Sequence, residues 1–209
     1  MSTDNRFFYE PSKGHGLPHN PLNAIIGPRP IGWISSRNRQ GQRNLAPYSF
    51  FNCFNYDPPI IGFASTAWKD SVANIVETGE FVWNLTTRRL AEQMNLTSAP
   101  LPRGTDEFEF AGLTPVAGNI VAADRVAESP VNFECKLTQC IQLTDANGDK
   151  IDTWLVLGEV VAVHIEKHLL SAEGVYQTAL AEPVLRAGGP SAYYGISDEQ
   201  RFDLHRPTL

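Results

Sequence analysis

Hydrophobic and polar residues alternate over several short stretches of this chain, a pattern typical of β-strands. In residues 30–36, Ile31 and Trp33 fall on one face and Ile34 falls on the other, so this stretch is a predicted strand. The polar residues 37–42 that follow contain a glycine and predict a hairpin loop. The first part of the chain therefore favours antiparallel β-structure.

Two further stretches, 50–54 and 60–64, are rich in aromatic and β-branched residues and are also predicted strands. Pro58 and Pro59 lie between them, and two adjacent prolines force an extended turn because both φ angles are fixed.

The two longest predicted strands, 132–143 and 154–165, lie in the C-terminal half and are joined by a turn at residues 145–149. Apolar and polar side chains alternate along the first strand, whereas the second is apolar on both faces over much of its length. A strand with two apolar faces is typical of a barrel wall that another layer covers.

One segment has helical spacing. Residues 72–76 carry apolar side chains at positions i, i+3 and i+4, and Gly79 is placed to end the helix. Either Asp70 or Ser71 is predicted to cap its N-terminus with a side-chain oxygen.

A strand is predicted over residues 80–85, a short helix over 88–96 and a loop-rich region over 100–115. Many short strands with few helices predict a mainly β fold: an antiparallel, closed or half-closed barrel with a few short peripheral helices. Because no linker or repeat divides the chain, residues 1–209 are expected to form a single domain, with residues 1–20 as an irregular lead-in.

Composition narrows the class of protein. The chain has 209 residues, of which 42% are hydrophobic and 19% charged, so it can bury a core and is not expected to be disordered. Its formal net charge of -6 and the lack of any basic run argue against nucleic-acid binding. Its apolar runs are too short to span a membrane. Three cysteines without metal-ligand spacing indicate a reduced, cytoplasmic protein.

Several candidate metal sites are weak. The acidic stretch 145–149 lacks the glycine and glutamate positions of a calcium loop, so a hairpin turn is the favoured interpretation. His15 and His19 are four residues apart, but the glycines and proline around them cannot form the helix that would bring both to one metal. His164 is interpreted as a hydrogen-bonded wall residue. We therefore predict no metal site.

The chain also lacks a phosphate-binding glycine motif and a nucleophile elbow. If the protein is an enzyme, its reactive atom is therefore expected to belong to a bound cofactor.

The helix start Lys69-Asp70-Ser71 has two interpretations that the residues leave open. A helix N-terminus with free N–H groups, a hydroxyl and a lysine is a natural phosphate site, but the same residues can simply cap the helix. Similarly, Arg186-Ala187-Gly188-Gly189 with Tyr193-Tyr194 is either part of a site or an ordinary loop with an aromatic plug.

Taken together, these segments resemble the flavin reductase-like family, which includes relatives of the nitrilotriacetate monooxygenase reductase component and has the FMN-binding split barrel. The resemblance covers about residues 20–195. It rests on these motifs in order: Arg29-Pro30-Ile31-Gly32-Trp33-Ile34-Ser35-Ser36, Asn44-Leu45-Ala46-Pro47-Tyr48-Ser49-Phe50-Phe51-Asn52, Asp57-Pro58-Pro59, Lys69-Asp70-Ser71-Val72-Ala73-Asn74-Ile75, Asp106-Glu107-Phe108, Glu128-Ser129-Pro130-Val131 and Arg186-Ala187-Gly188-Gly189. Two departures, Asn55 and Trp68, lie at positions where the family has other residue types.

The resemblance implies an FMN site, with the phosphate and ribityl chain near the first strand and the helix start, and the isoalloxazine along residues 46–52. Tyr193 or Tyr194 would close the site, across the subunit contact of a homodimer. The implied cofactor-binding residues are Trp33, Ser35, Ser36, Ala46, Pro47, Tyr48, Ser49, Phe50, Asn52, Ser65, Lys69, Asp70, Ser71 and Tyr193. No catalytic side chain is assigned.

The function that the resemblance implies is an NAD(P)H-dependent flavin reductase that supplies reduced FMN to a partner monooxygenase. One alternative is a flavoredoxin-like electron carrier that holds FMN but has no NAD(P)H activity of its own. Another is a barrel that has lost flavin binding.

Overall fold

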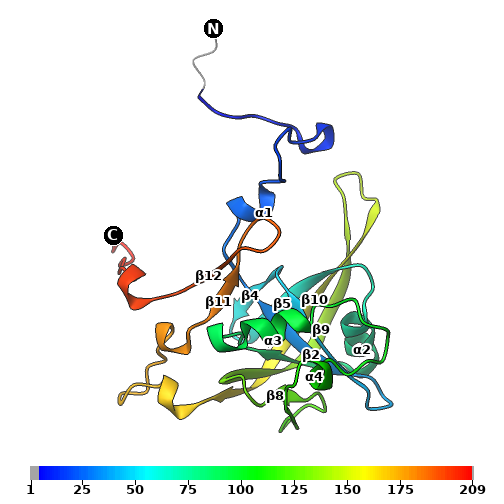
Figure 1. Ribbon diagram of the computed structural model, residues 1–209, viewed down its shortest axis with the longest axis vertical. Coiled ribbons are helices and arrows are strands. Elements are labelled where there is room, and N and C mark those ends of the chain that lie inside the picture. Colours follow the sequence, from blue (N-terminus) through cyan, green and yellow to red (C-terminus); the bar gives the residue numbers. More distant parts are fainter. Residues whose placement is uncertain (1–4, 209) are drawn as a thin grey trace.

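The computed structural model describes residues 5–208, and its main feature is a seven-stranded antiparallel sheet that curls into a barrel (Figure 1). The order of strands across this sheet is β3-β2-β6-β9-β10-β5-β4. These strands are β2 (Gly32–Arg37), β3 (Arg43–Tyr48), β4 (Phe51–Tyr56), β5 (Pro59–Thr66), β6 (Glu80–Asn84), β9 (Val131–Thr144) and β10 (Lys150–Ile165). The sheet curls so that β3, at one end, meets β5, the second strand from the other end; Tyr48 of β3 packs on Phe63 of β5 with ring centroids 4.4 Å apart.

Smaller elements surround the barrel. A three-stranded sheet contains β1 (Arg29–Pro30), β11 (Val184–Arg186) and β12 (Tyr193–Gly195), and a separate pair contains β7 (Pro115–Val116) and β8 (Arg125–Val126). The helices are α1 (Leu22–Ile25), α2 (Asp70–Thr78), α3 (Ala91–Leu96) and α4 (Glu107–Phe110), with 3-10 turns at Pro11–Lys13, Arg88–Leu90, Lys167–Leu169, Ala179–Ala181 and Asp198–Gln200. The predicted mainly β, antiparallel fold with a few short helices is confirmed. Within the described residues, no helix is long and apolar enough to cross a membrane.

Strand β2 is buried on both of its faces. Ile34 points into the barrel core, where it clusters with Phe63 and Phe81. Trp33, its neighbour in sequence, belongs to a second apolar cluster that includes Met94 of α3. Because successive side chains of a strand point to opposite faces, this one strand joins the barrel to its helices.

Most of the predicted elements are present, but β3 was missed. Its sequence, Arg43-Asn44-Leu45-Ala46-Pro47-Tyr48, contains a proline and two polar residues, which hide the alternation. The predicted loop-rich region 100–115 contains the short helix α4, which Asp106 caps by accepting hydrogen bonds from the N–H groups of Phe108 and Glu109.

The predicted cap of α2 was wrong. The N-cap residue is Lys69, it makes no side-chain capping hydrogen bond, and Asp70 and Ser71 lie inside the helix. The predicted end was correct, because Gly79 adopts a left-handed conformation with φ 77°. The hairpin turn between β9 and β10 also forms as predicted, and Asp145 accepts hydrogen bonds from the N–H groups of Asn147 and Asp149.

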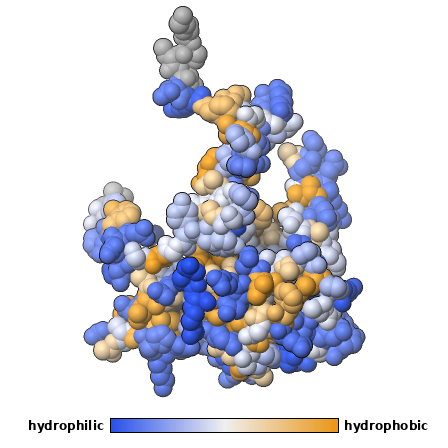
Figure 2. Space-filling view, in the orientation of Figure 1, coloured by the Kyte–Doolittle hydropathy of each residue, from blue (hydrophilic) through white to orange (hydrophobic). Residues whose placement is uncertain are grey.

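The N-terminal lead-in projects away from the barrel as an arm (Figure 1). Residues 5–20 contain only the 3-10 turn, in agreement with the predicted irregular lead-in, while residues 1–4 of that prediction lie outside the described residues. Phe7 and Phe8 on this arm are 66% and 80% exposed. Figure 2 shows hydrophobic residues both on the arm and on the barrel body.

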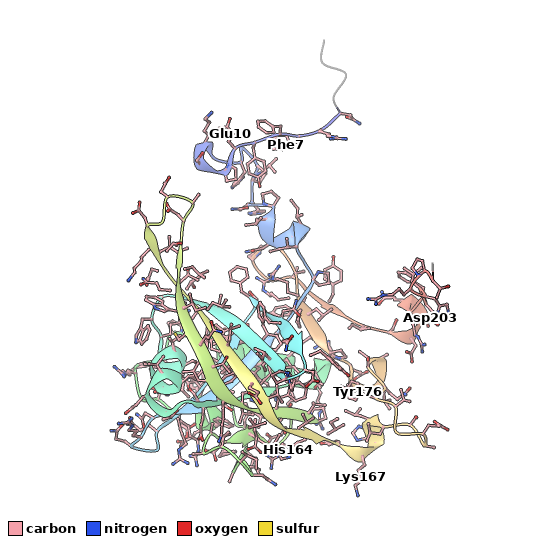
Figure 3. The ribbon with its side chains drawn as sticks, turned by 180° about the vertical axis from the view of Figure 1, so that it is seen from behind. Phe7, Glu10, His164, Lys167, Tyr176 and Asp203 are labelled. Carbon is pink, nitrogen blue, oxygen red and sulfur yellow. The ribbon has the colours of Figure 1, made fainter. Side chains whose placement is uncertain are left out.

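A buried carboxylate holds the segment that leads into β8. Glu134 is fully buried and accepts hydrogen bonds from the backbone N–H groups of Asn119, Ile120 and Val121. His164, near the end of β10 (Figure 3), places its Nε2 atom 2.6 Å from Oε1 of Glu134, so the histidine is a hydrogen-bonded wall residue as predicted. Burial alone would raise the pKa of Glu134, but these hydrogen bonds outweigh it and lower the pKa to about 2.

Substitution Glu134→Gln is expected to lower the free energy of unfolding by about 2–4 kcal/mol, because the amide accepts these N–H hydrogen bonds without a negative charge and faces one of its partners with an NH2 group. In the wild type, the contribution of this group is complete above the ordinary pKa of 4.5 and is lost as the pH falls toward about 2. Denaturant unfolding of both proteins between pH 7 and pH 2 measures this.

The matched control is Glu199→Gln, at an exposed position in the Asp198–Gln200 turn. A Glu134→Gln protein with the same unfolding free energy and acid profile as the wild type would contradict this role.

Candidate functional site

A cleft of about 520 Å³ opens between strand β3, the start of α2 and the loop that follows α3. Ligand sites in proteins are usually clefts of about 300–1,000 Å³, so the size fits a small organic cofactor. The lining residues are Asn44, Ala46, Pro47, Tyr48, Lys69, Asp70, Ser71, Thr97, Ser98, Ala99, Pro100, Leu101, Arg103 and Glu107.

A tight turn positions the start of α2 at this cleft. Ala67 has a φ of 73°, in the left-handed region that is unfavourable for alanine. The hydroxyl of Ser65 donates to the Ala67 carbonyl at 2.9 Å, and the Ala67 N–H donates to the carbonyl of Asp152 at 2.8 Å. Trp68 packs edge-on against Trp154 of β10, with centroids 5.2 Å apart. Contacts from β5 and β10 therefore hold this strained turn and fix the direction of α2.

The first turn of α2 presents free hydrogen-bond donors. The Ala73 N–H donates to the Lys69 carbonyl, so the N–H groups of Asp70, Ser71 and Val72 precede the first helical hydrogen bond. Without a side-chain cap, these donors and the positive end of the helix dipole remain available to an anion.

Two cationic side chains stand beside these donors. Lys69 is exposed, and its ammonium makes no ion pair or hydrogen bond with any of residues 5–208. Arg103, in the loop between α3 and α4, places its Nε atom 3.4 Å from the carboxylate of Asp70. The cleft thus holds two cationic side chains, and the carboxylates of Asp70 and Glu107 line it as well.

Strand β3 contributes the polar side chains of Asn44 and Tyr48 to the cleft. The side-chain amide of Asn44 donates to the hydroxyl oxygen of Ser71 at 2.7 Å, which leaves the hydroxyl hydrogen of Ser71 free to donate elsewhere. The hydroxyl of Tyr48 is buried close to the hydroxyls of Ser71 and Ser65. Burial raises the pKa of Tyr48, although the hydroxyls of Ser71 and Ser65 act in the opposite direction.

On the far side of the cleft, Glu107 accepts a hydrogen bond from the N–H of Leu45 at 2.9 Å. Burial raises the pKa of Glu107, and this hydrogen bond partly opposes that increase. The carboxylate therefore ties α4 to the outer edge of β3.

The structure brings six of the residues that the resemblance implied into this cleft, namely Ala46, Pro47, Tyr48, Lys69, Asp70 and Ser71. Four others are buried behind it: Trp33, Ser35, Ser36 and Ser65. Trp33 donates from Nε1 to the hydroxyl of Thr97 at 3.0 Å, and Ser36 accepts from Asn74 of α2 at 3.4 Å. The hydroxyl of Ser35 donates to the carbonyl of Asp124.

The remaining four implied residues lie elsewhere. Ser49 and Phe50 lie in the connection between β3 and β4, and Asn52 lies at the start of β4. The guanidinium of Arg29 donates a hydrogen bond to the Ser49 carbonyl and lies over the Phe50 ring. Tyr193 lines a second cleft, of about 600 Å³, between α3 and β12.

Sequence reasoning missed the lining residues Asn44, Glu107, Arg103 and the segment 97–101. The arginine in the loop Leu101-Pro102-Arg103-Gly104 was the one sequence feature that suggested an anion-binding side chain there. A loop sequence does not reveal which part of the fold the loop contacts, so the arginine could not be assigned to this cleft.

Comparisons with known proteins agree with this geometry. Residues 27–182 match the flavin reductase-like domain family, and the chain belongs to that family. An uncharacterized protein of Halalkalibacterium halodurans is 35% identical over 194 residues, which cover 90% of each chain. Among solved structures, nitrilotriacetate monooxygenase component B from Bacillus cereus has a TM-score of 0.83 at 28% identity, covering 98% of each chain. The 2-nitrobenzoate 2-nitroreductase NbaA of Pseudomonas fluorescens has a TM-score of 0.78 at 32% identity, covering 90% of this chain and 89% of that one. The fold is that of the FMN-binding split barrels.

Proposed function

We propose that this protein is an FMN-binding oxidoreductase that uses NAD(P)H to reduce flavin and supplies reduced FMN to a partner monooxygenase. The observation that carries this proposal is the uncapped, cationic start of α2 in a cleft beside the edge strand β3. The family membership and the similarity to a monooxygenase component support it. The free thiols of Cys53, Cys135 and Cys140 accord with a reduced, cytoplasmic location.

The donor set of the cleft fits the phosphate of FMN. A phosphate monoester is a dianion with three acceptor oxygens, and the first N–H groups of α2 and the ammonium of Lys69 are free donors for it. The guanidinium of Arg103 is a further donor, and it also pairs with the carboxylate of Asp70 in the first turn, which partly offsets its positive charge. The hydroxyl of Ser71, which accepts a hydrogen bond from Asn44, adds a neutral donor on the strand side.

Strand β3 fits the isoalloxazine ring. It is an edge strand paired only with β2 in the sheet, so alternate residues turn their backbone groups away from β2. Of these residues, Leu45 gives its N–H to Glu107 and Pro47 has no N–H, so the Pro47 carbonyl is the outward backbone group between Ala46 and Tyr48. We assign Ala46, Pro47 and Tyr48 to the polar edge of the ring, and Ser49, Phe50 and Asn52 to the rim beyond them.

When bound, FMN supplies a ring that accepts a hydride from NAD(P)H. The chain itself anchors the phosphate, aligns the ring along β3 and limits water access through the 97–101 loop, so positioning is its main contribution to the rate. The buried residues Trp33, Ser36 and Ser65 act as positioning residues, since each holds an element that lines the cleft. Ser35 acts in the same way, by fixing the segment that contains Asp124 against β2.

Oxidation of NADH or NADPH, followed by the nicotinamide absorbance with FMN added, tests the proposal directly. We expect turnover with at least one of the two. A yellow protein that a redox partner reduces but that is inert to both nucleotides would replace the proposal with the electron-carrier alternative. A colourless protein that takes up no FMN would reject both.

The phosphate site makes a separate prediction. Lys69→Ala is expected to weaken FMN binding about tenfold, because a charge-assisted hydrogen bond is lost, and Ser71→Ala is expected to weaken it severalfold. Titration with FMN and with riboflavin, which lacks the phosphate, measures this, and riboflavin binding is expected to stay unchanged.

Lys150→Ala, at the start of β10 beside the hairpin turn, is the matched control for loss of one positive charge. Equal losses for FMN and riboflavin, or no loss for either variant, would move the phosphate away from α2.

We further propose that the protein works as a homodimer. Strand β4 ends the sheet, and its side chains Phe54 and Tyr56 are 55% and 92% exposed. An apolar edge strand left open to water is a site for association. The projecting arm with Phe7 and Phe8 adds further apolar surface that its own barrel does not cover.

Tyr56→Lys is expected to shift the protein toward the monomer, because it places a charge on this edge without removing any packing inside the barrel. Light scattering across a dilution series measures the shift. Ile120→Lys, at a 55% exposed position in the segment between β7 and β8, is the control. A wild-type monomer, or identical profiles for the wild type and both variants, would refute the proposed interface.

A further inference from the structure

The second cleft lies against α3 itself, whereas the first lies against the loop that follows α3, and the two differ in chemical character. Its lining includes Arg88, Glu92, Met94, Asn95, Val184 and Tyr193. Met94 and Val184 form a buried apolar floor, while the rings of Tyr193 and Tyr194 are 41% and 60% exposed. A cleft of about 600 Å³ with an apolar floor and exposed aromatic rings suits a planar ring system.

The aromatic wall of this cleft is held in place. The guanidinium of Arg186 lies 5.1 Å from the centroid of the Tyr193 ring and also donates to the backbone carbonyls of the adjoining loop, including those of Gly189 and Pro190. Tyr193 and Tyr194 belong to β12, which pairs with β11. A ring fixed in this way loses little freedom when a ligand stacks on it.

One cation of this cleft has no partner. The guanidinium of Arg88 is exposed and makes no hydrogen bond or ion pair with the described part of the chain. The next residue, Arg89, differs, because its guanidinium donates to the carbonyl of Glu128 at 3.2 Å. Arg88 is therefore available to a ligand phosphate, and the nearby side chains of Asn95 and Glu92 can hydrogen-bond to a base edge and to ribose hydroxyls.

The two clefts meet at the end of α3. Asn95 and Leu96 line the second cleft, and the next residues along the chain, Thr97 and Ser98, line the first. This turn of chain therefore borders both clefts.

We propose that the second cleft binds the adenosine diphosphate half of the nicotinamide nucleotide, with the base against the tyrosine wall and a phosphate on Arg88. This inference rests on the proposed function, since the nicotinamide half then reaches the first cleft. It assigns the two halves of one substrate to two clefts that border the same turn of chain at the end of α3.

ADP-ribose tests this without turnover or flavin, because it carries the adenosine diphosphate but no nicotinamide. Calorimetric titration of the full-length protein is expected to show binding, and Arg88→Gln is expected to weaken it about tenfold. Arg89→Gln removes the same charge from the neighbouring position and is expected to leave the affinity within about twofold. Arg88→Gln is also expected to raise the KM for the nicotinamide nucleotide with FMN affinity unchanged.

Absence of ADP-ribose binding to the wild type would overturn the inference and would indicate that this cleft is covered by another part of the protein or by a second copy. Equal losses in Arg88→Gln and Arg89→Gln would also overturn it, since general electrostatic attraction would then account for binding. ADP-ribose binding in a protein that does not oxidise NADH or NADPH would support the second cleft while rejecting the reductase function.

Discussion

The double burial of β2 is the constraint on which the rest of the structure depends. Ile34 fills the barrel and Trp33 fills the cluster beneath α3, so one short strand carries part of two cores. The indole N–H of Trp33 also fixes Thr97 at the cleft. Because β3 pairs with β2 along its whole length, the same strand positions the edge that lines the cleft. The geometry of the site is thus a consequence of core packing, and changes in either core are transmitted to it.

The start of α2 combines two locally unfavourable features that the surrounding fold stabilises. A left-handed alanine and an uncapped helix are both unfavourable by themselves. They persist because Ser65, the Asp152 carbonyl and the Trp68–Trp154 pair determine the turn from outside. Trp68, a departure from the family pattern in the sequence, therefore has a structural reason in its contact with Trp154. The result is a helix start at the cleft whose first N–H groups have no side-chain cap.

The sequence left open whether Arg186 belongs to a site or to an ordinary loop, and in the structure it contacts both the loop and the Tyr193 ring. Its guanidinium donates to five backbone carbonyls, those of Ala187, Gly188, Gly189, Pro190 and Ala192, so it organises an ordinary loop. The same guanidinium lies over Tyr193 and thereby shapes the wall of the second cleft. A residue that holds a loop can in this way define a surface that it does not itself line.

Local pattern was sufficient to predict the strands with clear alternation, the helix α2 up to Gly79 and the β9–β10 hairpin, because side-chain periodicity and turn chemistry depend on neighbours in sequence. The ordered motifs also identified the family. Pro47 and the polar Arg43 and Asn44 concealed β3, since its strand conformation depends on pairing with β2. The alternation along β2 predicted on which face each of Ser35 and Ser36 lies. It did not predict that other elements cover both faces and bury both side chains. Only the tertiary structure brought Arg103, Glu107 and the 97–101 segment to β3 and α2, because a cleft is made by surfaces that are distant in the chain and meet only when the core packs.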